Sequence, residues 1–251
     1  MSEPALRFAD HFSGHAFSYA VHRPRYPAAL YEWLSASSAG TELAWDVGTG
    51  NGQVAQGLAT RFARVIATDP SEEQLSHAEP HARIKYQRTT YHPELSEASV
   101  DLVAVGQALH WFALDEFFGS VRRVLKPGGL FAAFAYTHSR VSPEIDTLMR
   151  HYHDVTVGPF WAPEHHWIHA GYRTMDLPIA EIEAPPFEIV ERWSCAQYLG
   201  FLRTWSSVQR LIKAEGDAKV LAFEAQLTEV WGRQAERAVV WPLILRAGRL
   251  Q

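Results

Sequence analysis

Residues 43–59 read LAWDVGTGNGQVAQGLA and place three glycines, Gly48, Gly50 and Gly52, between an apolar run and a helical pattern. Ordering a glycine costs conformational entropy, so glycines gathered where a strand meets a helix indicate that something approaches the main chain closely. The backbone N–H groups of such a turn lie at the positive end of the helix and suit an anionic or polar ligand. This stretch therefore predicts a strand, a tight turn and a helix around a ligand.

Short apolar runs alternate with amphipathic stretches from Leu43 to about Ala135. This alternation is typical of βαβ units, so we expect an α/β fold with a doubly wound, mostly parallel sheet. Such sheets bind ligands at the carboxyl ends of their strands, and the glycine turn follows the first strand of the series. The last run, AVVWPLILRAGRL, has no helix after it and fits an edge or antiparallel strand, which also tolerates Pro242.

The pattern along the chain divides it into four parts. Residues 1–36 form a lid segment with a helix from about Pro27, residues 37–138 the ligand-binding core, and residues 139–186 a cap insertion. Residues 187–251 complete the core, with a strand at FEIVERW and two helices near 196–215 and 218–233.

Composition excludes several classes of function. The 251 residues carry a net charge of -5, so they offer no basic surface for nucleic acid or for an anionic membrane. The longest apolar run, Ala238 to Leu245, is too short to span a bilayer and contains Pro242. The single cysteine, Cys195, cannot form an intramolecular disulfide. We expect a cytoplasmic protein with a small-molecule partner, and the sequence does not define its oligomeric state.

Two cofactors fit the glycine turn. Asp69 ends the strand RVIATD nineteen residues after Gly50, where an acid can accept hydrogen bonds from both ribose hydroxyls of an adenosine. The segment GNGQVA also matches the loose dinucleotide pattern G-x-G-x-x-G/A, which would make the protein an NAD-dependent oxidoreductase. Asp46 and the extra Gly48 favour instead a ligand with an amine and no pyrophosphate. A third possibility is a non-catalytic binding module built on the same fold.

Longer segments resemble a known family. DVGTGNGQ with Asp69, VDLVAVGQALHWF and VLKPGGLFAAF resemble the class I S-adenosylmethionine-dependent methyltransferases, and SYAVHRPRYP, LRTWSSVQR and VVWPLILRAGR are similar to segments of the branch that includes trans-aconitate methyltransferase. The resemblance implies a Rossmann-like sheet of seven strands with the last strand antiparallel. It also implies S-adenosyl-L-methionine as cofactor and a small-molecule acceptor, with carboxylic acids as the first class to test.

The candidate cofactor residues combine the glycine turn with this resemblance. Related enzymes often have an acidic residue after the third strand, where this chain has Thr89-Thr90-Tyr91, so Thr90 is expected to use its main-chain N–H on the adenine, and the adenine amine has no assigned partner. The full set is Tyr19, Arg23, Asp46, Gly48, Gly50, Gly52, Asp69, Pro70, Thr90 and Gln107.

The acceptor side is expected to involve the segment after VDLVAVG and the C-terminal signatures. We assign Trp111, Arg203 and Trp205 to the substrate, with Arg23 or Arg203 as the clamp for a carboxylate. His110 is the candidate catalytic base for a phenol or an amine, since a carboxylate needs none. The histidines at 151, 153, 165, 166 and 169 match no metal-binding motif, so we assign no metal.

Overall fold

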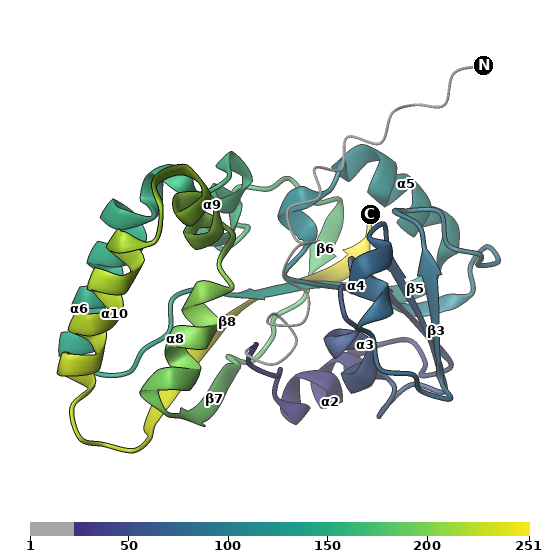
Figure 1. Cartoon of the computed structure of the whole chain (residues 1–251). Coiled ribbons are helices and arrows are strands. Elements are labelled where there is room, and N and C mark those ends of the chain that lie inside the picture. Colours follow the sequence, from purple (N-terminus) through teal and green to yellow (C-terminus); the bar gives the residue numbers. More distant parts are fainter. Residues whose placement is uncertain (1–22) are drawn as a thin grey trace.

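The computed structural model describes residues 23–251, with a mostly parallel sheet on one side and a group of helices on the other (Figure 1). The strands pair in the order β3-β2-β1-β4-β5-β8-β6, and β7 pairs with β8 outside this path. Strands β1 to β5 pair in parallel, whereas β8 runs antiparallel to β5, β6 and β7. The strands are β1 Leu43–Val47, β2 Arg64–Asp69, β3 Ile84–Arg88, β4 Val100–Gly106, β5 Leu125–Tyr136, β6 Ile179–Glu181, β7 Glu188–Trp193 and β8 Arg237–Leu250.

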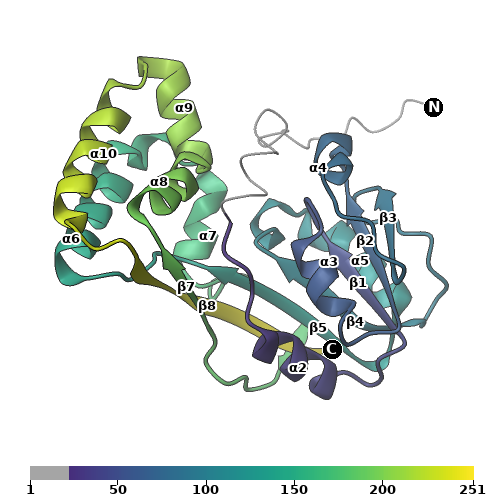
Figure 2. The ribbon, with the colours of Figure 1, turned by 60° about the horizontal axis from the view of Figure 1, so that its bottom comes forward.

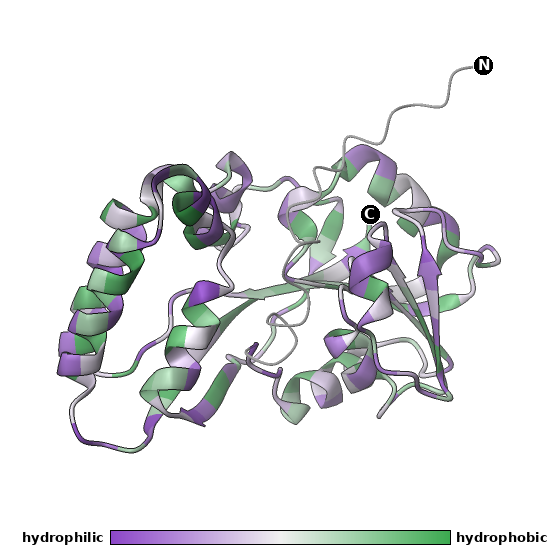
Figure 3. Cartoon of the chain, viewed as in Figure 1, coloured by the Kyte–Doolittle hydropathy of each residue, from purple (hydrophilic) through white to green (hydrophobic). Residues whose placement is uncertain are grey.

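The expected doubly wound sheet with an antiparallel last strand is confirmed. Both of its faces are buried: in β1, Trp45 joins a cluster with α5 (Leu114–Val124), and Ala44 joins a cluster with α2 (Ala28–Ser37) and α3 (Gln53–Leu58). Because both faces are covered, the central strand β1 is buried along its whole length and mostly apolar, whereas the edge strand β3 is mostly hydrophilic (Figure 3). The described residues hold eight strands rather than seven, because β7 forms on the outer half of β8.

A second hydrophobic core lies among the helices on the other side of the molecule, which we call the helical lobe (Figures 1 and 2). It contains α6 (Pro143–His151), α8 (Cys195–Arg203), α9 (Ser206–Glu215) and α10 (Ala218–Trp231), together with β7. Residues on both sides of the boundary expected at 186/187 contribute to this core. Helices from both sides of it pack together because their apolar faces cannot be buried on the sheet, whose faces are already covered.

Strand β8 connects the two parts. Its first half, residues 237–242, pairs with β7 under the helical lobe, and its second half, residues 243–250, pairs with β5 and β6 in the main sheet. Trp241 is accordingly buried in the core of the lobe, and Ala247 in the core of the sheet. One continuous strand thus fixes the lobe relative to the sheet.

The helix expected near 196–215 is divided into α8 and α9. Thr204 Oγ1 donates to the Phe201 carbonyl, Gln209 Nε2 donates to the Arg203 carbonyl, and Trp205 is extended. These side-chain bonds satisfy carbonyl groups at the end of α8 and let the chain turn there. The short elements are α4 Glu72–Ser76, η1 Leu109–Trp111, the π-helical turn η2 Tyr152–Thr156, η3 Gly158–Phe160, η4 Pro163–His165 and α7 His166–His169.

The chain reverses its direction of progress across the sheet between β1 and β4. It runs from β1 to β2 and β3 on one side, then crosses to β4 and β5 on the other. In sheets of this type a crevice opens at the carboxyl ends of the strands beside that switch point. None of the helices in residues 23–251 is long and apolar enough to cross a membrane.

Candidate active site

The glycine turn joins β1 to α3 with three left-handed glycines, whose φ values are +69° at Gly48, +55° at Gly50 and +87° at Gly52. A Cβ on Gly48 would lie 2.7 Å from the Ala108 side chain, and one on Gly52 would lie 2.4 Å from the Tyr86 hydroxyl. These two glycines are therefore required by the packing of the turn. A Cβ on Gly50 would meet nothing closer than the Gln74 side chain at 3.7 Å, so its bare face opens to a cavity.

This first cavity holds about 1010 Å³ of open space at the carboxyl edge of the sheet, and we call it the donor cavity. Seven of the expected cofactor residues line it. Arg23 precedes α2, and the others end or follow β1, β2, β3 or β4: Gly48, Gly50, Asp69, Pro70, Thr90 and Gln107. Gly52 and Asp46 do not line it, and Tyr19 lies outside the described residues. Strand order, rather than sequence proximity, brings these residues to one place.

Asp69 is 7% exposed, and its carboxylate is aimed at the glycine turn. Oδ2 accepts a hydrogen bond from the Gly50 N–H at 2.9 Å, and Oδ1 accepts one from the Ser71 N–H at 2.9 Å. Each carboxylate oxygen can accept more than one hydrogen bond, and Asp69 lines the donor cavity.

Asp46, which the sequence predicts to bind the cofactor, is not among the residues that line the donor cavity. Its side chain is fully buried behind the turn, and Oδ2 accepts a hydrogen bond from Thr49 Oγ1 at 2.5 Å. Burial raises the pKa of this carboxyl to about 7, partly offset by hydrogen bonds from Thr49 and the Ala55 backbone. Asp46 thus ties the turn to the first residues of α3 from inside.

A second cavity of about 680 Å³, the acceptor cavity, opens between the sheet and the helical lobe. It shares Arg23, Gln107, Trp111 and Tyr136 with the donor cavity, so the two spaces meet at these side chains. Its other walls are aromatic and imidazole side chains with a few small neighbours: His110, Thr137, His138, His153, Trp161, His165, Ile168, His169, Phe201, Trp205 and Ser206.

Arg23 and Gln107 are held at the junction of the two cavities. The Arg23 Nη1 donates to the Tyr136 hydroxyl at 2.7 Å, and its guanidinium lies 5.6 Å from the centre of the Phe201 ring. Gln107 has φ +55°, which is unusual for a residue other than glycine, and its N–H donates to the Phe134 carbonyl at 2.9 Å. Strained backbone of this kind tends to occur where a side chain is positioned for a ligand.

Comparison with known proteins identifies the family. A family model described as a methyltransferase domain matches residues 45–133. A protein of Dictyostelium discoideum named as a methyltransferase is 30% identical over 220 residues, 86% of this chain and 83% of that protein. A solved structure from Anaeromyxobacter dehalogenans, described as a type II methyltransferase, is 41% identical, with a TM-score of 0.85 over 90% of this chain and 97% of that one. The chain belongs to the class I S-adenosylmethionine-dependent methyltransferases.

The methyltransferase therefore uses S-adenosyl-L-methionine, and the alternatives of an NAD-dependent oxidoreductase and a non-catalytic module are wrong. Similarity to a methyltransferase of Mycobacterium tuberculosis is confined to 114 residues at 35% identity, 45% of this chain and 46% of that protein. The names of these relatives do not state a methyl acceptor.

The surroundings of His110 argue against a role as general base. Burial, with a smaller contribution from His165, lowers the pKa of His110 to about 3. Its Nδ1 lies 3.0 Å from the hydroxyl of the buried Tyr172. A general base works best when its pKa is near the working pH, so a ring that holds a proton this weakly is poorly suited to removing one. In the methyltransferase, His110 lines the acceptor cavity as a neutral side chain.

Arg203, unlike Arg23, lies outside both cavities. Its Nε and Nη2 donate to the two carboxylate oxygens of Glu224, at 2.5 and 2.7 Å, and this pair joins α8 to α10. A guanidinium engaged bidentately in this way is not placed to clamp a substrate. Of the three residues expected to contact the substrate, Trp111 and Trp205 line the acceptor cavity.

Sequence reasoning missed His138, Tyr136 and Trp161. Tyr136 ends β5 and His138 follows it, which is a position at the ligand-bearing edge of the sheet. Burial first, then the neighbouring His153 and His169, lowers the pKa of His138 to about 4. The position after a core strand was therefore a usable signal for His138, whereas no pattern distinguished Trp161 from the other tryptophans.

Proposed function

We propose that this enzyme transfers the methyl group of S-adenosylmethionine from the donor cavity to a small molecule bound in the acceptor cavity. The observation that carries the proposal is the shared wall of Arg23, Gln107, Trp111 and Tyr136, at which the two cavities meet. A donor bound in one cavity and an acceptor bound in the other would meet at this junction, close enough to react. Holding the two in line accounts for most of the rate enhancement that such a reaction requires.

The donor cavity has chemistry that fits an adenosine and an amino acid. The Asp69 carboxylate is proposed to accept hydrogen bonds from the ribose hydroxyls, while Gly50 leaves room for the cofactor beside the turn. Thr90 and Pro70 also line the donor cavity and are proposed to contact the adenine, whereas Gln107 lines both cavities. When bound, S-adenosylmethionine supplies an electrophilic methyl group on a positively charged sulfur.

The acceptor is proposed to be a small carboxylic acid. Arg23 supplies a planar guanidinium at the junction of the cavities, and such a group matches the two oxygens of a carboxylate. The aromatic side chains of Trp111, Trp205 and Phe201 would surround the apolar part of such a molecule and keep water away. A carboxylate is ionised at neutral pH and needs no general base, which agrees with the neutral state of His110.

Two measurements test the proposal. Calorimetry with S-adenosylhomocysteine should show binding at one site per chain, and absence of binding would contradict the donor cavity. An acceptor screen across carboxylates, phenols, thiols and amines, read out as S-adenosylhomocysteine formed, should give activity with carboxylates. Activity confined to phenols or amines would overturn the carboxylate assignment while leaving the methyltransferase assignment intact.

A further inference from the structure

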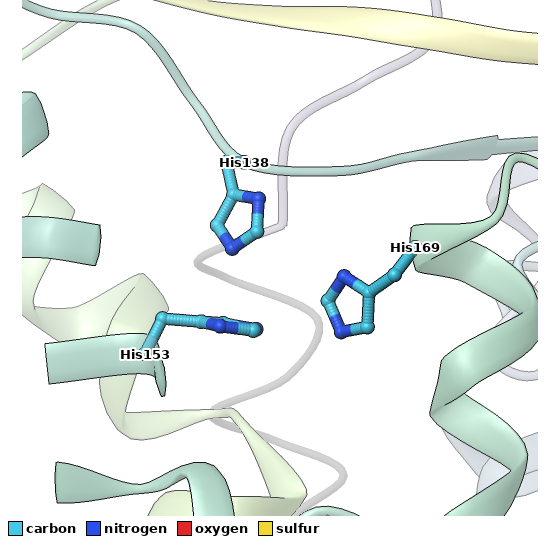
Figure 4. A group of neighbouring side chains, drawn as sticks. All are labelled: His138, His153 and His169. Carbon is cyan, nitrogen blue, oxygen red and sulfur yellow. The ribbon is translucent and has the colours of Figure 1, made fainter. Parts of the chain in front are cut away.

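Three histidines from distant parts of the chain converge in the wall of the acceptor cavity. His138 follows β5, His153 lies in the π-helical turn η2, and His169 ends α7. Figure 4 shows the three rings pointing toward one another, and one nitrogen of each lies within 4.8 Å of one nitrogen of each of the others. π-helical turns such as the one that carries His153 occur often at functional sites.

The surroundings of two of these rings are those of metal ligands. His153 is buried, and its Nδ1 is paired with the Asp154 carboxylate at 2.7 Å, which leaves Nε2 as the nitrogen available to the cluster. A metal-binding histidine usually makes such a bond to a carboxylate with its other nitrogen. Nε2 of His138 is buried and has no hydrogen-bond partner among residues 23–251. An unsatisfied buried nitrogen is costly, and a bound ion would satisfy it.

We propose that His138, His153 and His169 bind a divalent transition-metal ion, of which zinc is the model, with its remaining coordination position open to the acceptor cavity. Three imidazole nitrogens suit zinc, iron, nickel or copper, whereas magnesium and calcium prefer oxygen ligands. Three protein ligands with an open fourth position are the arrangement of reactive zinc sites, because structural sites use four.

The geometry requires only a small adjustment. In a tetrahedral site with bonds of ~2.0–2.1 Å, the ligand nitrogens lie about 3.4 Å apart, so the widest present separation must shorten by roughly 1–1.5 Å. His169 is exposed, and its side chain can rotate inward without disturbing a packed core. The two other rings are already in contact, with their centroids 4.1 Å apart.

The open position would bind an anionic oxygen of the acceptor, on the same cavity that Arg23 lines. This consequence rests on the proposed function, whereas the metal site itself rests on the three histidines alone. A metal there would help to hold the acceptor and would select for molecules with a carboxylate or another oxygen anion.

The test uses the full chain without a histidine tag, treated with a chelator and then titrated with Co²⁺, which has visible absorption bands that report tetrahedral nitrogen ligation. The natural chain should bind one Co²⁺ with such a spectrum. His169→Ala and His138→Ala should weaken this binding by at least about 100-fold. The control is His151→Ala, an exposed histidine on α6 two residues before His153, which should bind Co²⁺ as the natural chain does. No tetrahedral spectrum in the natural chain, or an unchanged titration in both site variants, would overturn the metal site.

Two further measurements test the metal site and the proposed methyl transfer separately. Azide should change the Co²⁺ spectrum if a coordination position is open, and an unchanged spectrum would overturn the open position. S-adenosylhomocysteine affinity, measured by calorimetry on the same samples, should be the same in His169→Ala and in the natural chain. If the natural chain binds Co²⁺ but not S-adenosylhomocysteine, the proposed function fails and the metal site stands.

Discussion

The donor cavity and the acceptor cavity meet at four side chains, yet they are built in different ways. The donor cavity uses backbone and strand-end side chains, nearly all from residues 47–112, which one sheet edge brings together. The acceptor cavity uses Arg23 and mostly large side chains from residues 107–111, 136–138, 153–169 and 201–206, assembled by packing of the helical lobe against the sheet. The first is therefore determined by topology, and the second by side-chain packing between distant segments.

The sharpest test of the donor cavity compares two glycines that both have positive φ. Gly50 (φ +55°) and Gly128 (φ +73°) both leave space for a Cβ, but only Gly50 lines the cavity. Gly50→Val should reduce S-adenosylhomocysteine affinity by more than about 100-fold, because the new side chain occupies the space of the cofactor. Gly128→Val should leave affinity unchanged, and both variants should lose roughly 1–2 kcal/mol of stability from the left-handed backbone. Calorimetry and thermal unfolding measure these quantities, and equal affinities in the two variants would place the cofactor elsewhere.

A second comparison uses two buried aspartates at opposite edges of the sheet. Asp69 ends β2 at the donor cavity, whereas Asp101 near the start of β4 accepts from the Glu42 and Leu43 N–H groups and pairs with Lys126. Asp69→Asn should weaken S-adenosylhomocysteine binding by about 10–100-fold, since charge-assisted hydrogen bonds are replaced by weaker neutral ones. Asp101→Asn should lower stability by about 1–3 kcal/mol without changing affinity. The reverse pattern would contradict the ribose assignment.

The contrast between the cavities also explains which features the sequence predicted. Gly48, Gly50, Asp69, Thr90 and Gln107, which the sequence predicts to bind the cofactor, all line the donor cavity, because each lies at or just after the end of a strand in a regular alternation. Asp46 was also predicted to bind the cofactor, but its side chain is buried behind the turn, and the sequence does not reveal this because the burial depends on how the turn folds back onto α3.

In the helical lobe, sequence reasoning had less to use. Arg203 was expected to face a substrate, but its partner Glu224 lies on another helix, and no local pattern indicates that pair. The sequence shows several histidines within residues 139–186 but not how they are arranged, because spacing along the chain does not reveal that His153 and His169 lie next to His138. Contacts between segments far apart in sequence are set by packing, and residue periodicity does not encode them.

A third comparison uses Arg23, which lines the acceptor cavity, and Arg203, which lies in the helical lobe beside it. With an acceptor identified by the screen, Arg23→Lys should raise the acceptor KM by about tenfold or more, because lysine cannot bind a carboxylate bidentately. Arg203→Lys should change neither the acceptor KM nor the cofactor affinity. It should lower the free energy of unfolding by at most about 1 kcal/mol, because the Arg203–Glu224 pair is partly exposed. Steady-state kinetics and calorimetry decide between them. A larger change in KM for Arg203→Lys than for Arg23→Lys would show that the acceptor binds on the lobe side of α8.

The smallest effect concerns the pH dependence of stability, which the buried imidazoles of the acceptor cavity should control. Burial lowers the pKa of His110 in the folded chain to about 3, below its usual value, so the unfolded chain binds more protons between these two values. The contribution of neutral His110 to the stability of the folded chain is therefore complete above pH ~6.5 and is lost as the pH falls toward 3. Between pH 6.5 and 5.5 this one histidine should remove about 1 kcal/mol. The free energy of unfolding should therefore fall by about 1 kcal/mol less in His110→Asn than in the natural chain between pH 6.5 and 5.5, whatever the stability of the variant at pH 8. Urea unfolding at the two pH values measures the difference. A loss in His110→Asn equal to that of the natural chain would show that His110 titrates alike in the folded and unfolded chain.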